Sequence, residues 1–362
     1  MSQSDQNNDS SVPANNSTNR KSSINPNSRT QFNRRRELLS ADEYVKGIQN
    51  GNTAVLSRAI TLIESTKPEH RALAQDIIEQ CLPGSGDSIR IGITGVPGVG
   101  KSTFIETLGN RIIDKGHRLA VLAIDPSSSR SKGSILGDKT RMETLANSDR
   151  AYIRPSPTRG SLGGVARKTR ETIYLCEAAG YDTIFIETVG VGQSETAVHS
   201  MVDFFLLLML AGAGDELQGI KRGIMEMADA IAINKIDEAA EKAVQQAVRE
   251  YKNAFHLYPE AASGWQPKVV TCSAETGEGI DDIWELIRAY IKLTRGNGYF
   301  ERKRNRQARH WMYDTIETHL TEHFFQHPAV TQRQPAIEQQ VLEGKISSFR
   351  AAQKLLDAYF KG

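Results

Sequence analysis

A glycine-rich segment that contains one lysine and one serine joins an apolar run to a helix-like stretch. The apolar run is residues 91–94, the segment is residues 95–102 (GVPGVGKS), and residues 103–108 follow it. Glycines let the backbone curl so that successive N–H groups point at phosphate oxygens, while a lysine reaches the β- and γ-phosphates and a serine hydroxyl ligates Mg²⁺. The pattern predicts a phosphate-binding loop between a strand and a helix, and hence a nucleoside triphosphatase. The residues expected around the phosphates are Gly95, Gly98, Val99, Gly100, Lys101, Ser102 and Thr103.

A second polar loop follows an apolar, strand-like run further along the chain. Its residues Asn234, Lys235 and Asp237 have the guanine-specificity spacing Asn-Lys-x-Asp. A carboxylate at Asp237 can accept hydrogen bonds from N1–H and the exocyclic amine of guanine, and leaving it unpaired rejects adenine by roughly 10⁴-fold or more. An ordinary polar loop is the alternative. A later strand-like run ends at Ser273 and Ala274, whose backbone N–H groups would meet guanine O6, and this favours the guanine site.

A magnesium ion beside the phosphates needs hard oxygen ligands, and three acidic residues are candidates together with Ser102. Asp125 and Glu187 each close an apolar, strand-like run, and Asp138 lies in the long polar loop after Asp125. For the three acids, the alternative is a helix cap or a surface charge. Glu187 also leads into a Gly-rich segment in which Gly190 can donate its N–H to the γ-phosphate.

Hydrolysis at such a site depends mostly on positioning and on neutralising negative charge at the phosphates. Mg²⁺ and Lys101 would supply the positive charge. Glu187 would hold the Mg²⁺ shell or orient the attacking water. Lys101 and Glu187 are therefore the candidate catalytic residues, and the patterns assign no glutamine or arginine that activates water.

These segments resemble the methylmalonyl-CoA mutase-associated GTPases, the MeaB/ArgK family. Besides the phosphate loop, the resemblance is carried by residues 125–129, 133–142, 154–157, 162–166, 187–195 and 214–221, and it runs from about residue 40 to the C-terminus. It implies a homodimeric GTPase that is the chaperone of an adenosylcobalamin-dependent mutase, gates delivery of the cofactor, and protects or reactivates the mutase. The cofactor would be held by the mutase rather than by this chain.

The resemblance also implies roles for particular residues. By it, Asp125, Asp138 and Glu187 are the acids of the Mg²⁺ site. Residues 214–221 would be a third switch that contacts the nucleotide or the partner protein.

Two other functions stay open beside this one. The first is a kinase or ATPase associated with amino-acid (lysine, arginine or ornithine) transport, as the older ArgK naming proposed, and the guanine-specificity spacing argues against it. The second is a nickel-insertion GTPase, a class that typically carries His-rich or Cys/His segments, whereas the eight histidines here are scattered. His319, His323 and His327 share a helical face but alternate with apolar residues, so we expect packing or solvation there rather than metal binding.

Composition excludes several partners. The net charge of +2 shows no long single-sign bias, and we expect no nucleic-acid partner. The longest apolar run, residues 204–212, is too short to cross a bilayer, so no membrane partner is expected. The three cysteines are far apart and are expected to be reduced. These features favour the cytoplasm, with the mitochondrial matrix as the alternative because the N-terminal tail is rich in Ser and Arg.

The elements that must position these residues indicate an α/β fold, a P-loop NTPase with a mostly parallel central sheet. We expect a disordered tail at 1–36, an N-terminal helical extension at 37–84, a P-loop GTPase domain at 85–296 and a C-terminal helical dimerisation arm at 297–362. The arm is expected to contain two long amphipathic helices, 299–326 and 335–360, with the basic run 302–306 on a solvated face. Their apolar stripes pass through Trp311, Ile316 and Leu320, and through Leu342, Ile346, Leu355 and Phe360.

Overall fold

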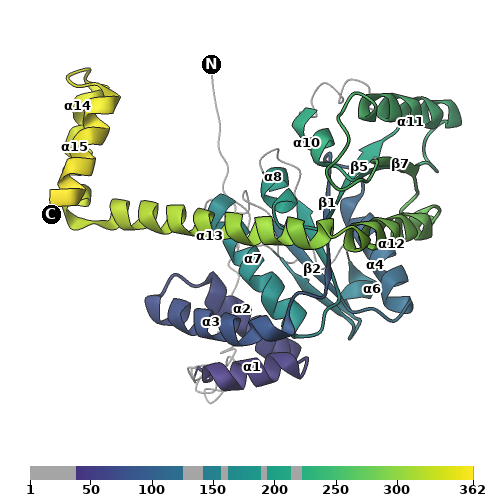
Figure 1. The fold of residues 1–362 in the computed structure, drawn as a ribbon, viewed down its shortest axis with the longest axis horizontal. Helices are drawn as coiled ribbons and strands as arrows, with labels where there is room; N and C mark the ends of the chain where they lie inside the picture. Colours follow the sequence, from purple (N-terminus) through teal and green to yellow (C-terminus); the bar gives the residue numbers. More distant parts are fainter. Residues whose placement is uncertain (1–37, 125–141, 156–161, 189–193, 213–221, 362) are drawn as a thin grey trace, which may run out of the picture. The chain divides into compact units, whose positions relative to one another are not determined.

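A sheet of seven strands forms the centre of the structure, a computed structural model that describes residues 38–124, 142–155, 162–188, 194–212 and 222–361 (Figure 1). The strands are β1 (Ile89–Gly95), β2 (Leu119–Ile124), β3 (Ala151–Arg154), β4 (Thr183–Thr188), β5 (Phe204–Leu210), β6 (Ala230–Asn234) and β7 (Lys268–Thr271). Their order is β3-β2-β4-β1-β5-β6-β7, and every neighbouring pair is parallel. The expectation of a mostly parallel sheet is confirmed.

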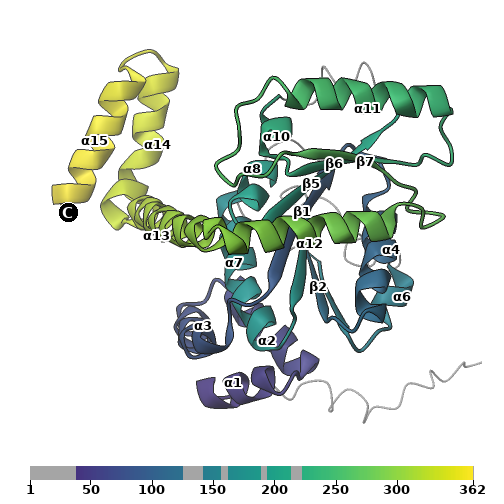
Figure 2. The same cartoon turned by 45° about the vertical axis from the view of Figure 1, so that its right-hand side comes forward.

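Helices cover both faces of the sheet (Figures 1 and 2). One face is packed by α4 (Lys101–Asp114) and α12 (Ile280–Gly296), whose side chains share a buried cluster with β1 and β5. The other face is contacted by α7 (Leu162–Ala178) and α8 (Ser194–His199). Burial on both faces explains why the strands read as nearly continuous apolar runs. The remaining helices of this region are α6 (Glu143–Ala146), α10 (Arg222–Met227) and α11 (Glu241–Phe255).

Three helices precede the sheet: α1 (Ala41–Gln49), α2 (Thr53–Glu64) and α3 (Pro68–Cys81), followed by the single turn η2 (Leu82–Gly84). The first begins at a capping box, in which Ser40 and Glu43 satisfy each other's backbone N–H groups. All three helices contact α7. The helical extension expected before the sheet is therefore present as packed structure, whereas the expected tail at 1–36 lies outside the described residues.

The C-terminal region contains three helices rather than the two expected: α13 (Tyr299–Gln326), α14 (Pro328–Leu342) and α15 (Ser348–Lys361). Figure 2 shows α14 and α15 side by side beyond the end of α13. The chain turns between them at Gly344, whose φ of 70° lies in the left-handed region that ends helices. The expectation of one continuous helix over 335–360 was wrong for this reason.

The first half of α13 packs on the chain's own core. Trp311 is 8% exposed, whereas Ile316 and Leu320 are 47% and 59% exposed, so the expected apolar stripe divides between two faces of the helix. Lys303 Nζ donates to Asp203 O at 2.7 Å, and Arg304 Nη2 lies 2.7 Å from Asp203 Oδ2. The expectation that the run 302–306 forms a solvated face is wrong for these two residues, because they pair with the amino end of β5.

Cys81, Cys176 and Cys272 are buried and free, as expected for reduced thiols. In the part of the chain that the structure describes, no helix combines the length and the apolar character needed to cross a membrane.

Candidate nucleotide-binding site

The predicted phosphate loop lies where β1 ends and α4 begins. Gly100, the N-cap of α4, has a φ of 89°, and a Cβ there would lie 3.0 Å from the side-chain nitrogen of Asn234. Both the left-handed backbone and the close approach require glycine at this position. The loop therefore delivers Lys101 and Ser102 to the first turn of α4, where unpaired N–H groups favour an anion.

A cavity of about 600 Å³ opens beside this loop, a size typical of small-ligand sites. It collects residues from the carboxyl ends of five strands, β1, β2, β4, β6 and β7, the position at which parallel α/β sheets bind ligands. The lining residues are Pro97, Gly98, Gly100, Lys101, Ser102, Thr103, Ala123, Glu187, Asn234, Lys235, Glu238, Ala274 and Glu275.

The cavity unites most of the described residues predicted for the site. Pro97, Ala123, Glu238 and Glu275 also line it and were not predicted. The sequence offered a signal for Ala123, because it is the second-last residue of an apolar strand and lies two residues before the predicted metal ligand Asp125. The acidic pair at 238 and 275 had none, since their side chains depend on how the loops after β6 and β7 turn.

The ammonium group of Lys101 lies against the phosphate loop itself. Its Nζ donates to Gly95 O at 3.0 Å and to Val96 O at 3.2 Å. Burial lowers the pKa of Lys101, and the nearby charges of Glu187 and Glu195 oppose that shift. A phosphate oxygen that enters the cavity would replace neutral carbonyl acceptors by a charged one, which forms a stronger hydrogen bond.

Asn234 joins the phosphate loop to the loop after β7. Its Nδ2 donates to Val99 O at 2.8 Å, and its Oδ1 accepts the N–H of Ala274 at 2.9 Å. The side chain is buried, and both polar ends are satisfied within the protein. Asn234 therefore holds two walls of the cavity together.

The donors expected to meet guanine O6 are engaged within the protein in this structure. Ser273 N–H donates to Glu278 O at 3.0 Å, and Ala274 N–H is the donor to Asn234. Thr107 Oγ1 donates to Ala274 O at 2.7 Å and so ties this loop to α4. A base that takes the Ala274 N–H would share it with Asn234.

Asp237 is exposed and, among the described residues, stands outside the lining of the cavity. The chain leaves β6 through Lys235, whose φ of 62° is unusual for a residue with a side chain. Lys235 Nζ lies 3.3 Å from Glu238 Oε2, which places that carboxylate at the cavity instead. The role of Asp237 in base selection stays a prediction.

Two of the four predicted Mg²⁺ ligands lie at the cavity. Ser102 lies in the first turn of α4, and Glu187 lines the same cavity from β4, where strand register pairs it with Ile93 of β1 and with Ala123 of β2. A hydroxyl and a carboxylate are the hard oxygen donors that Mg²⁺ prefers, so this pair fits the ion. Asp125, Asp138 and the predicted γ-phosphate donor Gly190 lie outside the described residues, as does the segment 214–221.

The three histidines of α13 and its C-terminal end make contacts typical of packing. His319 Nε2 lies 3.2 Å from Arg167 Nη1, and His323 Nδ1 lies 2.8 Å from Tyr359 OH. The rings of His323 and His327 also lie edge-on to the ring of Tyr359. Over the described ranges, no group of three His, Cys, Asp or Glu residues has the geometry of a metal site.

A family model described as "Methylmalonyl Co-A mutase-associated GTPase MeaB" matches residues 56–329. The chain belongs to this family. This MeaB-family chain is 49% identical over 319 residues to a probable GTPase of Mycobacterium tuberculosis, covering 88% of this chain and 95% of the relative. It is 46% identical over 334 residues to the mouse (Mus musculus) protein named "Methylmalonic aciduria type A homolog, mitochondrial", covering 90% and 80% of the two chains.

A solved structure supports the same assignment. The crystal structure of a protein named "LAO/AO transport system kinase" has a TM-score of 0.71 and 35% sequence identity, and the match covers 89% of this chain and 99% of that one. The MeaB-family chain is thus a P-loop GTPase by fold and by family. The resemblance stated from its motifs is confirmed.

Proposed function

We propose that this chain hydrolyses GTP to GDP and phosphate, and that it is the chaperone of an adenosylcobalamin-dependent mutase of the methylmalonyl-CoA type. In that role it gates cofactor loading and protects or reactivates the mutase, which itself holds the adenosylcobalamin. The observation that carries the proposal is the cavity that unites the phosphate loop with Asn234 and Lys235, in a chain whose family model is named for its association with this mutase.

The residues that line the cavity would have different roles in hydrolysis. Mg²⁺, held by Ser102 and Glu187, would neutralise charge on the β- and γ-phosphates. Lys101 exchanges its loop carbonyls for phosphate oxygens and adds a second positive charge at the site of bond cleavage. Asn234 keeps the phosphate loop in register with the base-binding loop, so that base and phosphates are read together.

A homodimer formed through the C-terminal arm, and a location in the cytoplasm, belong to the same proposal. The mitochondrial matrix is the alternative location, since the mouse relative carries "mitochondrial" in its name. The proposal includes no nucleic-acid or membrane partner.

The chaperone role requires that nucleotide and mutase affect each other's binding. A coupling of about 1–3 kcal/mol predicts a five- to hundredfold change in nucleotide affinity when the mutase is added. The test is isothermal titration of the full chain against the mutase of the same genome, with GDP and with a non-hydrolysable GTP analogue. If neither form binds at micromolar concentration and the mutase leaves GTP turnover unchanged, the chaperone role is wrong and the GTPase role stands.

The protein with the similar crystal structure carries the name of a second candidate, a kinase of an amino-acid transport system. A kinase would move the γ-phosphate to an acceptor, whereas a GTPase releases it as inorganic phosphate. Incubation with γ-labelled GTP or ATP, with and without a lysine-, arginine- or ornithine-binding protein, separates the two by where the label goes.

A further inference from the structure

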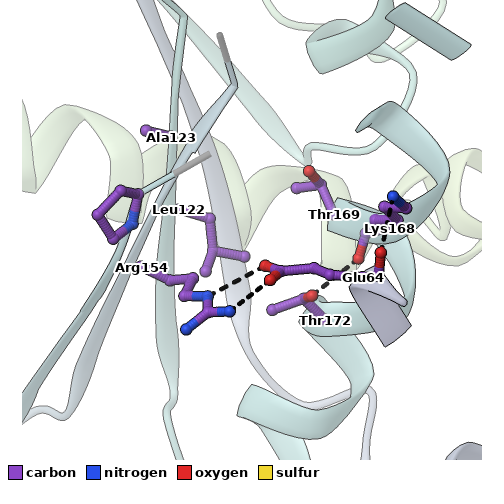
Figure 3. A pocket seen from close by; sticks show the side chains of 8 residues that line it. Glu64, Leu122, Ala123, Arg154, Lys168, Thr169 and Thr172 are labelled. Carbon is purple, nitrogen blue, oxygen red and sulfur yellow. Dashed lines mark hydrogen bonds and ion pairs between the residues drawn. The ribbon is translucent and has the colours of Figure 1, made fainter. Parts of the chain in front are cut away.

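The N-terminal helical extension contacts the sheet at the carboxyl ends of its strands, and the nucleotide cavity lies at the same end of the sheet. Helix α2 ends at Glu64, and its carboxylate meets Arg154, the last residue of β3 (Figure 3). The contact is two-pronged: Arg154 Nε lies 3.1 Å from Oε1, and Nη2 lies 2.5 Å from Oε2. The main-chain carbonyl of Glu64 accepts a third bond, from Lys168 Nζ of α7 at 3.1 Å.

These contacts are partly shielded from water. The side chains of Arg154 and Glu64 are 25% and 19% exposed, so the pair is stronger than an open surface pair. Removing one partner leaves the other charge partly buried and unpaired, which is the costly way to break such a pair. The end of α2 is therefore held firmly to the end of β3.

A small cavity lies beside the pair, lined by Glu64, Leu122, Ala123, Arg154, Pro155, Lys168, Thr169 and Thr172. Its volume of about 10 Å³ admits no more than a single water molecule. Thr169 and Thr172 use their hydroxyl groups on carbonyls of their own helix. The place is too small for a ligand, and its charged groups serve to join elements.

The contact between Glu64 and Arg154 is linked to the nucleotide cavity through neighbouring strand positions. Arg154 is paired in strand register with Leu122 of β2, and the next residue, Ala123, lines both the small cavity and the nucleotide cavity. Ala123 is paired in turn with Glu187 of β4. Each step from Glu64 to the candidate Mg²⁺ ligand is thus an ion pair or a neighbouring strand position.

We propose that Glu64 is a positioning residue of the nucleotide site. Through Arg154 it sets where the carboxyl ends of β3 and β2 lie, and through them the wall formed by Ala123 and Glu187. The N-terminal helices are then a working part of the GTPase and not a separate appendage. This inference rests on the proposed GTP hydrolysis.

The test compares Glu64→Gln, which keeps the shape and removes the charge, with Ser57→Ala. Ser57 Oγ lies 3.1 Å from Tyr152 OH and joins the same helix to the same strand, but about two helical turns before Glu64. The measurements on the full chain are kcat/KM for GTP, the affinity for a fluorescent GDP and the melting temperature. We expect Glu64→Gln to lower kcat/KM by about two- to thirtyfold, the range seen for residues that act on a site through neighbours.

Ser57→Ala is expected to leave kcat/KM unchanged even if the melting temperature falls as much. The double variant Glu64→Arg, Arg154→Glu reverses the pair and should restore part of the loss. A Glu64→Gln protein with wild-type kcat/KM, or an equal loss in Ser57→Ala, would overturn the positioning role. If Glu64→Gln does not fold, Arg154→Lys keeps the charge, loses the two-pronged contact, and is judged by the same criteria.

A wild-type chain that does not hydrolyse GTP would refute the proposed function instead. The positioning role is then judged from GDP affinity in the same variants. A weaker affinity in Glu64→Gln than in Ser57→Ala supports it, and equal affinities overturn it.

Discussion

Two polar side chains that line the nucleotide cavity, Asn234 and Lys101, already form hydrogen bonds with backbone groups of the protein itself. Asn234 uses both ends of its amide on backbone groups, and Lys101 uses two carbonyls of its own loop. The two cases differ in what a ligand would change. Asn234 must stay in place to hold two loops together, whereas Lys101 can exchange neutral acceptors for phosphate.

We therefore expect Lys101→Ala to remove most GTP turnover without unfolding the chain. Loss of one group that stabilises transition-state charge costs about 10²–10³ in rate. Phosphate release measures the activity, and a circular-dichroism melt measures the fold. A melting temperature several degrees below that of the wild type would show instead that the lysine has a structural role.

Base selection is tested by Asp237→Asn. An amide can donate a hydrogen bond to the 2-oxo group of xanthine, whereas the carboxylate accepts from the 2-amino group of guanine. The variant should prefer xanthosine triphosphate, and it should fold normally because Asp237 is exposed. The measurement is the turnover of GTP and xanthosine triphosphate in competition with each other. A wild-type protein that turns over ATP and GTP equally would contradict the prediction.

At the scale of residues, motif spacing predicted the phosphate loop, Glu187 and Asn234, because these positions follow directly from strand ends. It did not predict Glu238 or Glu275. Their place at the cavity depends on local turns such as the left-handed Lys235, and no periodic pattern in the sequence encodes such a turn.

Among the elements, α8 carries a titratable group whose state depends on folding. Burial, and to a smaller degree the charge of Lys303, lower the pKa of His199 to about 4. The unfolded chain then binds a proton below about pH 6.5 that the folded chain refuses until about pH 4, so stability falls as the pH drops through this window. The loss attributable to His199 is up to about 3 kcal/mol.

The prediction is that His199→Gln flattens the decline in melting temperature between pH 6.5 and 4.5. Other carboxyl groups titrate in the same range, so the measurement is the difference between variants. His310, exposed on α13, provides the control, and His310→Gln should follow the wild-type curve. Identical slopes for all three proteins would show that His199 is protonated in the folded chain.

The strands were predicted well because burial on both faces of the sheet leaves a strong apolar signal in the sequence. The C-terminal helices were predicted less well. The basic run at 302–306 has the composition of a surface helix, yet Lys303 and Arg304 pair with Asp203, about 100 residues away in the chain. The residues next to a basic side chain in the sequence do not indicate an acidic partner that lies so far away along the chain.

At the scale of the whole molecule, the arm leaves several large apolar side chains at least 40% exposed. They are Met312, Tyr313, Ile316 and Leu320 on α13, and Phe349, Leu356 and Phe360 on α15. Removal of such surface from water drives association, at about 25 cal/mol per Å². This supports the proposed homodimer.

We expect the double variant Ile316→Asp, Leu320→Asp to be a monomer that still binds GTP. Sedimentation velocity measures its mass. Leu257→Asp is the control, because Leu257 is 85% exposed near the end of α11 and should not affect association. A double variant that stays dimeric would exclude the α13 face from the interface. A chain cut before α13 is a poorer test, since it would leave the buried Asp203 without Arg304.

The attachment of α13 also has a mechanical consequence. Its first half is bonded to Ser200, Val202 and Asp203, which lie in the short connection between α8 and β5. At 28 residues the helix is a rod of about 42 Å. About 15 residues, or about 22 Å, lie beyond the last of these bonds at Trp311, so a rotation of about 5° there would move the far end of the helix by about 2 Å. Small movements of the connection between α8 and β5 would therefore become larger displacements at the far end of α13, where α14 and α15 follow.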